Sequence, residues 1–295
     1  MTKQDGLGIF HLDMDLTVRP QQLIFEHWRN RLEPHRQLFE YLENIGECAK
    51  KKFPHNPKEE SQLDSFNREK MIILIFASNQ FEGSKFSHIE TNRILADWIG
   101  RSTQDIMKAL EPEPFDLSMS KRQRPPSRRE VLQHYLAFRE IMAGLENPLT
   151  EEKIRSVNKT LMTGLLDDDG LAIDEGNYRT ENISARGFLF RDPKFVAKDM
   201  ADLVNKFNEE VNNPEVDSCL LAGWLMAQYL LIHPFNDGNG RISRLLFNYT
   251  LAKRGIKHVI PMVESSKTRT LYMEALKRYQ RVERQSDPHK RLSTL

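Results

Sequence analysis

A dense group of polar residues follows the most apolar run of the chain. The stretch HPFNDGNGRISR, residues 233–244, brings together a histidine, a carboxylate, an asparagine, two glycines and two arginines. A neutral imidazole is the usual general base near pH 7, so His233 is a candidate proton acceptor. Asp237 offers the oxygen ligand that magnesium takes when phosphates also bind it. These two residues predict proton transfer beside a metal-assisted phosphate site.

The rest of this stretch predicts an anion site. Gly238, Asn239 and Gly240 can adopt turn conformations that point successive backbone N–H groups at an anion. A helix is expected to begin here, and its positive end would face the same place. Arg241 and Arg244 are three residues apart, so both guanidinium groups lie on one helical face and can bind phosphate oxygens. The stretch therefore predicts a polyphosphate site next to a base.

The same stretch resembles the motif of the Fic family, HPFx[DE]GNGRxxR, at every specified position. The resemblance extends through most of residues 128–285, because GNYRTENI at 176–183 is similar to the segment that leads into the family's flap. It implies an all-α fold, in which a helical Fic core with a small β-hairpin flap follows a helical N-terminal regulatory region. It also implies an enzyme, a protein adenylyltransferase that moves AMP from ATP to a Ser, Thr or Tyr hydroxyl of a target protein.

The resemblance assigns a role to each motif residue. His233 would deprotonate the target hydroxyl, which attacks the α-phosphate in line. Asp237 would hold Mg²⁺ or Mn²⁺ between the α- and β-phosphates. Arg241 would contact the β-phosphate and Arg244 the γ-phosphate, and pyrophosphate would leave. The α-phosphate would lie against the backbone and the asparagine side chain of Gly238, Asn239 and Gly240.

The expected flap is the segment Thr180–Leu189, which resembles a surface on which a target chain docks by adding a strand. An ordinary surface hairpin is the alternative. Many relatives end the flap with paired prolines, whereas this chain has FRDP at 190–193. Tyr272 resembles a position near the adenine, with Met273 in place of a companion aromatic residue. The target-docking residues would be Ile183, Ser184, Ala185, Arg186, Gly187 and Phe188.

A second motif, SNQFEG at 78–83, fits the family's inhibitory pattern [ST]xxxE[GN]. Ser78 and Glu82 are four residues apart and share a helix face, and Gly83 is a common helix terminator. The resemblance implies that Glu82 pairs with Arg244 and keeps AMP transfer nearly silent. It leaves open that Glu82 also positions a water for the reverse removal of AMP. The alternative is an ordinary capped helix end.

The elements that must position these residues are mostly helices. Four prolines and a basic run mark 111–127 as a linker or surface loop, which separates a helical N-terminal region with the inhibitory helix (1–110) from the Fic catalytic domain (128–285). Residues 286–295 form a C-terminal tail, and a hairpin is expected around residues 186–187. Helical patterns cover 20–51, 66–83, 88–100, 129–145, 150–166, 194–211, 216–232, 242–255 and 268–285.

Composition narrows the class of protein. The net charge is +1, with acidic and basic residues mixed, which argues against a nucleic-acid partner. Two distant cysteines without a CxxC exclude a disulfide scaffold. No apolar leader is visible at the N-terminus, and the apolar run 219–232 is too short to span a membrane. A cytoplasmic protein is expected, with ATP and unknown target proteins as partners and a homodimer left open.

Two other functions stay open. The Doc branch of the superfamily transfers phosphate with a lysine where Gly240 stands here, so the glycine favours nucleotidyl transfer. A non-catalytic binding protein is the other alternative, which would use the basic run Lys121, Arg122, Arg124, Arg128 and Arg129.

Overall fold

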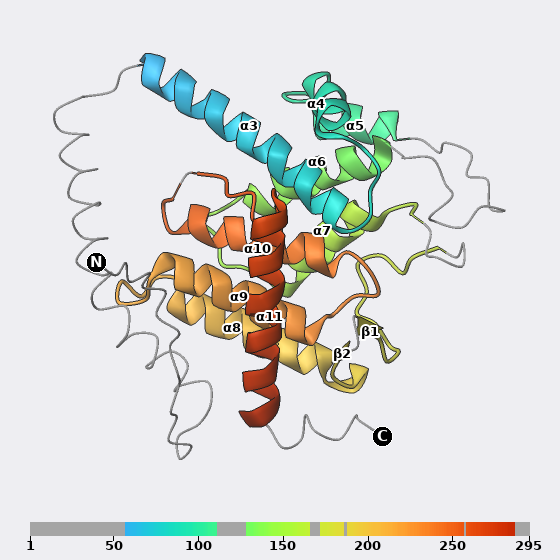
Figure 1. Cartoon of the computed structure of the whole chain (residues 1–295), viewed down its shortest axis with the longest axis vertical. Helices are drawn as coiled ribbons and strands as arrows, with labels where there is room; N and C mark the ends of the chain where they lie inside the picture. Colours follow the sequence, from blue (N-terminus) through green and yellow to red (C-terminus); the bar gives the residue numbers. More distant parts are fainter. Residues whose placement is uncertain (1–56, 111–127, 166–171, 186–187, 257, 287–295) are drawn as a thin grey trace, which may run out of the picture. The chain divides into compact units, whose positions relative to one another are not determined.

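Helices make up most of the chain that this computed structural model describes, namely residues 57–110, 128–165, 172–185, 188–256 and 258–286 (Figure 1). The expected all-α fold is confirmed, and the small hairpin is present as two short antiparallel strands. The elements, in chain order, are α3 (Pro57–Phe81), α4 (His88–Ala96), α5 (Thr103–Ala109), α6 (Arg128–Met142), α7 (Glu151–Met162), β1 (Ser184–Ala185), β2 (Phe188–Leu189), the 3₁₀ turn η1 (Pro193–Phe195), α8 (Val196–Glu210), α9 (Ser218–Ile232), α10 (Asn239–Lys253) and α11 (Ser266–Ser286).

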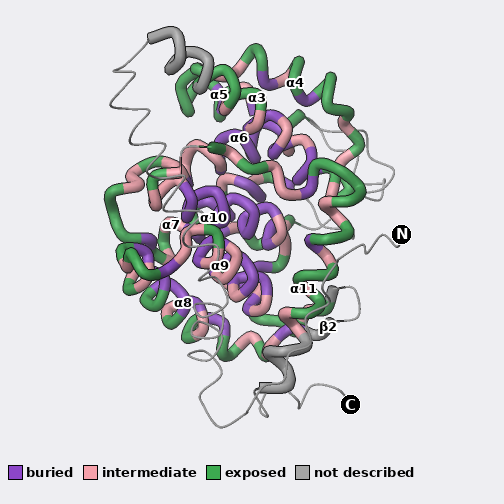
Figure 2. The backbone as a smooth tube through the Cα atoms, turned by 60° about the vertical axis from the view of Figure 1, so that its left-hand side comes forward, coloured by how far each residue is buried: buried purple, intermediate pink, exposed green. Residues whose placement is uncertain are grey.

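The centre of the fold is the pair α9 and α10, which lie side by side and carry much of the burial (Figure 2). Helix α9 begins where the Asp217 side chain accepts a hydrogen bond from the backbone N–H of Leu220 at 2.8 Å, a typical helix cap. It is apolar almost throughout, as expected of a helix covered by neighbours on several sides. All residues of α10 from Arg241 to Leu251 are buried. The motif loop between these helices is therefore attached to a deeply buried part of the molecule.

Helix α3 packs against α4, α6 and α10. The segment that carries SNQFEG therefore lies against the motif helix α10, which begins within HPFNDGNGRISR. Its buried face joins an apolar cluster with α4, α5 and α6 that includes Ile75, Leu95, Ile106 and Leu132. Helix α4 is held at its start by a reciprocal pair of bonds between Ser87 and Glu90. The expected helix over 88–100 thus exists, but the separate helix α5 after it was not expected.

The basic run requires a correction. Arg129 was counted with the basic run that a partner could contact, yet it lies in the first turn of α6 and is buried. Its guanidinium donates to the backbone carbonyls of Leu110 and Thr163, because a buried cation needs acceptors. Arg128 is exposed beside it, and Lys121, Arg122 and Arg124 lie outside the described residues.

Other expectations fall partly on residues that the structure does not describe. The helical pattern at 20–51, the linker at 111–127 and all but the first residue of the tail at 286–295 are among them, so the predicted domain boundaries stay predictions. Among the described helices, none is both long and apolar enough to cross a membrane.

Candidate active site

The motif loop begins with a strained residue. His233 ends α9 in the left-handed conformation, with φ 51° and ψ 62°, and among the described residues no other non-glycine has positive φ. Its N–H still bonds the carbonyl of Tyr229 at 2.9 Å. Left-handed backbone is uncommon for a non-glycine residue and is often found where function requires a defined side-chain direction.

The imidazole of His233 is enclosed. The ring of Phe190 stacks on it with the centroids 3.8 Å apart and the planes at 19°. Its Nδ1 lies 3.3 Å from the carbonyl oxygen of Leu230; a carbonyl only accepts, so Nδ1 carries the hydrogen and Nε2 is an acceptor. Burial is the main cause that lowers the pKa of His233 to about 4, and the nearby Arg179 charge acts in the same direction. The ring is therefore neutral at pH 7, as a general base must be.

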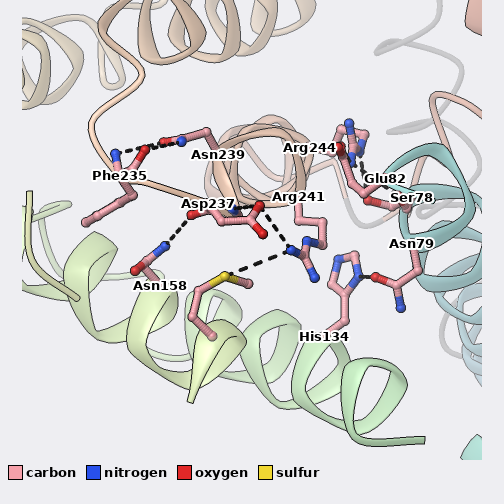
Figure 3. A network of polar contacts seen from close by, with 12 residues as sticks. Ser78, Asn79, Glu82, His134, Asn158, Phe235, Asp237, Asn239, Arg241 and Arg244 are labelled. Carbon is pink, nitrogen blue, oxygen red and sulfur yellow. Dashed lines mark hydrogen bonds and ion pairs between the residues drawn. The ribbon is translucent and has the colours of Figure 1, made fainter. Parts of the chain in front are cut away.

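The loop keeps its shape through Asn239. This side chain accepts from the N–H of Phe235 at 3.1 Å and donates to the Phe235 carbonyl at 2.7 Å (Figure 3). The side chain is buried and uses one of its two amide N–H groups to fold the turn. Its predicted place in the α-phosphate cradle stays a prediction.

The two glycines of the motif are required for different reasons. Gly238 adopts φ 84° at the start of α10, where a side chain would also press on Asn158 and Met162. Gly240 has no positive φ and lies inside the helix. A Cβ there would overlap Oε1 of Glu82 and lie 3.3 Å from Nη1 of Arg244. The expectation of a turn conformation at Gly240 was wrong, because a close approach from α3 explains the glycine.

The two arginines of the motif turn toward different helices. Nη2 of Arg241 lies 3.5 Å from Oδ1 of Asp237 and 3.9 Å from Sδ of Met162 on α7. Arg244 turns toward α3, where its Nε donates to the Ser78 hydroxyl at 2.7 Å. Arg241 Nε and Arg244 Nη1 are buried without a hydrogen-bond acceptor among the described residues, and buried donors of this kind indicate a place for an anion or water.

Glu82 already supplies one anion to this place. Its carboxylate lies 2.6 Å from Nη2 of Arg244, whose side chain is 1% exposed, while that of Glu82 is 34% exposed. Burial by itself lowers the pKa of Arg244, but the negative charge of the Glu82 carboxylate opposes it, and the net effect raises the pKa. The expected ion pair is therefore present, and the carboxylate stands at the first turn of α10. Gly83 follows with φ 98°, as expected of a helix terminator.

Asp237 presents its carboxylate at the edge of the loop, with the side chain 34% exposed. Its Oδ1 accepts from the N–H of Gly238 at 2.5 Å. The described residues contain no cluster of three or more His, Cys, Asp or Glu side chains, so a cation here would have at most two such protein ligands. That suits magnesium, which commonly takes one or two carboxylates and completes its shell with phosphate oxygens and waters.

The flap and the adenine side can be placed in part. Ser184 of β1 pairs with Leu189 of β2, and Ala185 with Phe188. Ile183 just before β1 is half-buried, whereas Ser184 is exposed. The turn residues 186–187 and the side chains of residues 185, 188 and 189 lie outside the described part.

Tyr272 packs edge-to-face on Phe81 with ring centroids 5.7 Å apart. Phe81 in turn lies 5.4 Å beneath the Arg244 guanidinium. Met273 packs on the same cluster. The predicted adenine-side residue therefore lies against the end of α3.

Several residues at the site were missed by sequence reasoning. Asn79 accepts from His134 Nδ1 at 2.8 Å and donates to the Glu130 carbonyl at 3.4 Å, which fastens α3 to α6. Asn158 on α7 donates to the carbonyl of Asp237 at 3.0 Å and accepts from Gly176 N–H at 2.8 Å. Arg179, which donates to backbone carbonyls around His233, was also missed. Only its place in GNYRTENI pointed to it.

Known proteins share this domain and fold. Residues 148–251 match the model of the Fic/DOC family, so the chain contains a Fic/DOC domain. A Fido domain-containing protein from Dictyostelium discoideum is 34% identical over 93 residues, which cover 32% of this chain and 65% of that protein. The protein adenylyltransferase fic-1 of Caenorhabditis elegans is 33% identical over 104 residues, which cover 35% of this chain and 20% of that protein. The chain thus spans less than two thirds of either relative.

A solved structure agrees over a larger part of the chain. The Fic domain containing signaling protein from Bacteroides thetaiotaomicron superposes with a TM-score of 0.57 at 24% identity, and the match covers 80% of each chain. At this identity, the likeness shows a common fold.

Proposed function

We propose that this chain, which carries a Fic/DOC domain over residues 148–251, transfers AMP from ATP to a Ser, Thr or Tyr hydroxyl of a target protein. The observation that carries the proposal is the position of the Glu82 carboxylate, an anion paired with buried Arg244 at the first turn of α10. A phosphate group would find the same guanidinium and the same helix end there. His233 lies at the other end of this loop as a neutral, directed imidazole.

The proposed reaction is an in-line displacement. Nε2 of His233 accepts the proton of the target hydroxyl while the hydroxyl oxygen bonds to the α-phosphorus. The bond from the α-phosphorus to the oxygen bridging the β-phosphate breaks, and pyrophosphate leaves with that electron pair. The imidazole then releases its proton to solvent. A bound triphosphate would raise the low pKa of this ring toward the range in which it works as a base.

The surrounding residues position the nucleotide. The backbone at Gly238 and Gly240 would contact the α-phosphate, while Arg241 and Arg244 would bind the β- and γ-phosphates. Asp237 would hold Mg²⁺ or Mn²⁺, which supplies charge neutralisation on the phosphates when bound. Positioning and electrostatic stabilisation would provide most of the rate enhancement, as is usual for phosphoryl chemistry.

Glu82 would act as an inhibitor in the same site. Its contact with Arg244 occupies the guanidinium that the γ-phosphate needs, so ATP could bind only with a displaced triphosphate. Ser78 supports this state, since its hydroxyl accepts from Nε of the same arginine. The intact chain would then be nearly silent in AMP transfer, and a change that removes Glu82 would release it.

The test is transfer from ATP labelled on the α-phosphate, followed in a whole lysate and by auto-modification. The chains to compare are intact protein, Glu82→Gly, and Glu82→Gly combined with His233→Ala. We expect strong labelling with Glu82→Gly, weak labelling with the intact chain and none with the double variant, and mass spectrometry of the product distinguishes AMP from UMP or phosphate adducts. A phosphate adduct would place the reaction with the Doc branch. Absence of any adduct with Glu82→Gly would refute the proposed function.

A further inference from the structure

One buried arginine joins the flap to the end of α9. Arg179 is 2% exposed, and its guanidinium donates to four backbone carbonyls. Two of them belong to the end of α9 and the motif loop, at 2.8 Å for His233 and 3.3 Å for Ile232. The other two belong to the stems of the flap, at 2.9 Å for Glu181 and 2.5 Å for Arg191.

These acceptors lie on both sides of the hairpin and on the strained residue itself. Glu181 precedes β1 and Arg191 follows β2, so one planar group spans the base of the flap. The backbone N–H of Arg179 adds a bond to the carbonyl of Pro234 at 2.9 Å. A left-handed non-glycine residue such as His233 persists only where its surroundings over-determine it. Arg179 thus binds the carbonyls of Ile232, His233 and Pro234, which lie before, at and after the strained position.

The flap also touches the imidazole directly. Phe190 follows β2 immediately, is 4% exposed, and extends the hairpin pairing through its N–H to the Ile183 carbonyl at 3.1 Å. Its ring covers one face of the His233 ring. Arg179, just before the flap, thus holds the backbone of His233, and Phe190, just after the flap, covers its side chain.

We propose that Arg179 and Phe190 are positioning residues through which the flap sets the place of the His233 imidazole. The base is therefore held in place from the segment on which a target strand would dock. The inference rests on the proposed function for the role of His233 as the base. Neither residue touches the nucleotide in this scheme, so both act on the chemical step and not on ATP affinity.

The test uses Arg179→Lys and Phe190→Leu in the Glu82→Gly chain. Lysine keeps the positive charge but cannot reach four carbonyls with a planar group. Arg254→Lys is the matched control, because Arg254 also donates to three carbonyls, those of Val211, Asn213 and Val216, away from the site. We expect kcat to fall by on the order of 10²-fold for Arg179→Lys, as for a small displacement of a catalytic group. The Kd for ATP should stay within about twofold of the parent. Arg254→Lys should lower the Tm without that loss of kcat.

A second measurement does not depend on activity. Nuclear magnetic resonance of labelled histidine would follow the His233 ring, which faces the charges of Arg179, Glu82 and Asp237. Both variants should shift the ring signals and its protonation toward those of an exposed histidine, whereas the control should not. If Glu82→Gly transfers nothing, the proposed function fails, and this measurement still decides the positioning role.

Three results would overturn the inference. One is a kcat within about twofold of the parent for both Arg179→Lys and Phe190→Leu, and a second is unchanged His233 signals in both. An equal loss of kcat in Arg254→Lys at matched Tm would also overturn it, by showing a general loss of stability. If Arg179→Lys fails to fold, Phe190→Leu decides alone, because that substitution leaves all the carbonyl contacts of Arg179 in place.

Discussion

Replacement of Glu82 by glycine is the perturbation that most directly separates a regulatory contact from an ordinary helix end. The carboxylate lies 2.6 Å from Nη2 of Arg244. Helix α3 already ends just before Gly83. The substitution therefore removes one anion from the site, while the capping bonds of the Asn79 carbonyl to Glu82 N–H and Ser84 N–H remain available. We expect a higher rate of AMP transfer.

The size of the effect follows from the contact. A hydrogen bond to a charged group contributes about 1.5–3 kcal/mol, but Glu82 is 34% exposed, so solvent screening lowers the estimate to about 1–2 kcal/mol. A bias of that size changes an equilibrium by roughly 5- to 30-fold. Glu82→Gly should raise the initial rate of transfer by about this factor.

Two further variants isolate the cause. Glu82→Gln keeps the shape and a hydrogen-bond acceptor but removes the charge, so its rate should lie between those of the intact chain and Glu82→Gly. Arg244→Ala should not be activated, because it loses the proposed γ-phosphate contact together with the inhibitory one. The assay is auto-modification by labelled ATP at equal chain concentration, with ATP binding measured by calorimetry.

Equal transfer rates for the intact chain and Glu82→Gly, with both chains active, would refute an inhibitory role for Glu82. SNQFEG would then be a capped helix end and the ion pair incidental. Activation of Glu82→Gly without any activation of Glu82→Gln would locate the effect in the volume of the side chain rather than its charge.

Three other outcomes are expected. His233→Ala in the Glu82→Gly chain should abolish transfer and leave the ATP affinity within about twofold of the parent, since the phosphate contacts lie elsewhere. Labelled ATP measures the transfer and calorimetry measures the affinity. A transfer rate near that of the parent would show that His233 is not the base. Asp237→Ala should mimic chelation by EDTA in the same assay, and full transfer in excess EDTA would contradict the metal role. Burial is the main cause that lowers the pKa of His233 from 6.5 to about 4, and the charge of Arg179 acts in the same direction. Between pH 6.5 and pH 4 the unfolded chain therefore binds a proton at this ring that the folded chain does not. The free energy of unfolding should therefore decrease between pH 6.5 and pH 4, by up to about 3 kcal/mol, and urea titrations that show no decrease would contradict the buried state of the ring.

Much of the fold follows from local patterns. Apolar residues at helical spacing predicted α4 and α6 to α11 with errors of a few residues at their ends, because helix signals are local. The prediction for α3 missed its first nine residues, because the helix begins at Pro57 rather than at residue 66. The motif loop was predicted for the same reason, since its glycines and polar residues are consecutive. Even the contact between Glu82 and Arg244 was foreseen, but through a resemblance and not from spacing alone; the bond from Arg244 to Ser78 was not foreseen.

The residues that fasten the site together could not be predicted in this way. Arg179 and His233 are 54 positions apart, and Asn79 and His134 are 55 apart. Their partners are mostly backbone carbonyls, which every residue possesses and no pattern of letters reveals. Arg129 was misplaced for a related reason: a basic run beside prolines is typical of a surface loop, yet tertiary acceptors at Leu110 and Thr163 bury its last member.

Burial of Arg244 links the structure of the site to the inhibition proposed for Glu82. A fully buried guanidinium needs acceptors, and Arg244 Nη1 has none among the described residues, so a carboxylate or phosphate beside this group is favourable. Glu82 meets this requirement in the free chain, and the γ-phosphate would meet it in a productive complex. The two anions cannot both occupy one guanidinium in the same geometry, because Glu82 also fills the space above Gly240. Inhibition and substrate binding would then be alternative ways of satisfying one buried charge, which explains why a helix from outside the matched Fic/DOC segment packs so closely on the motif helix.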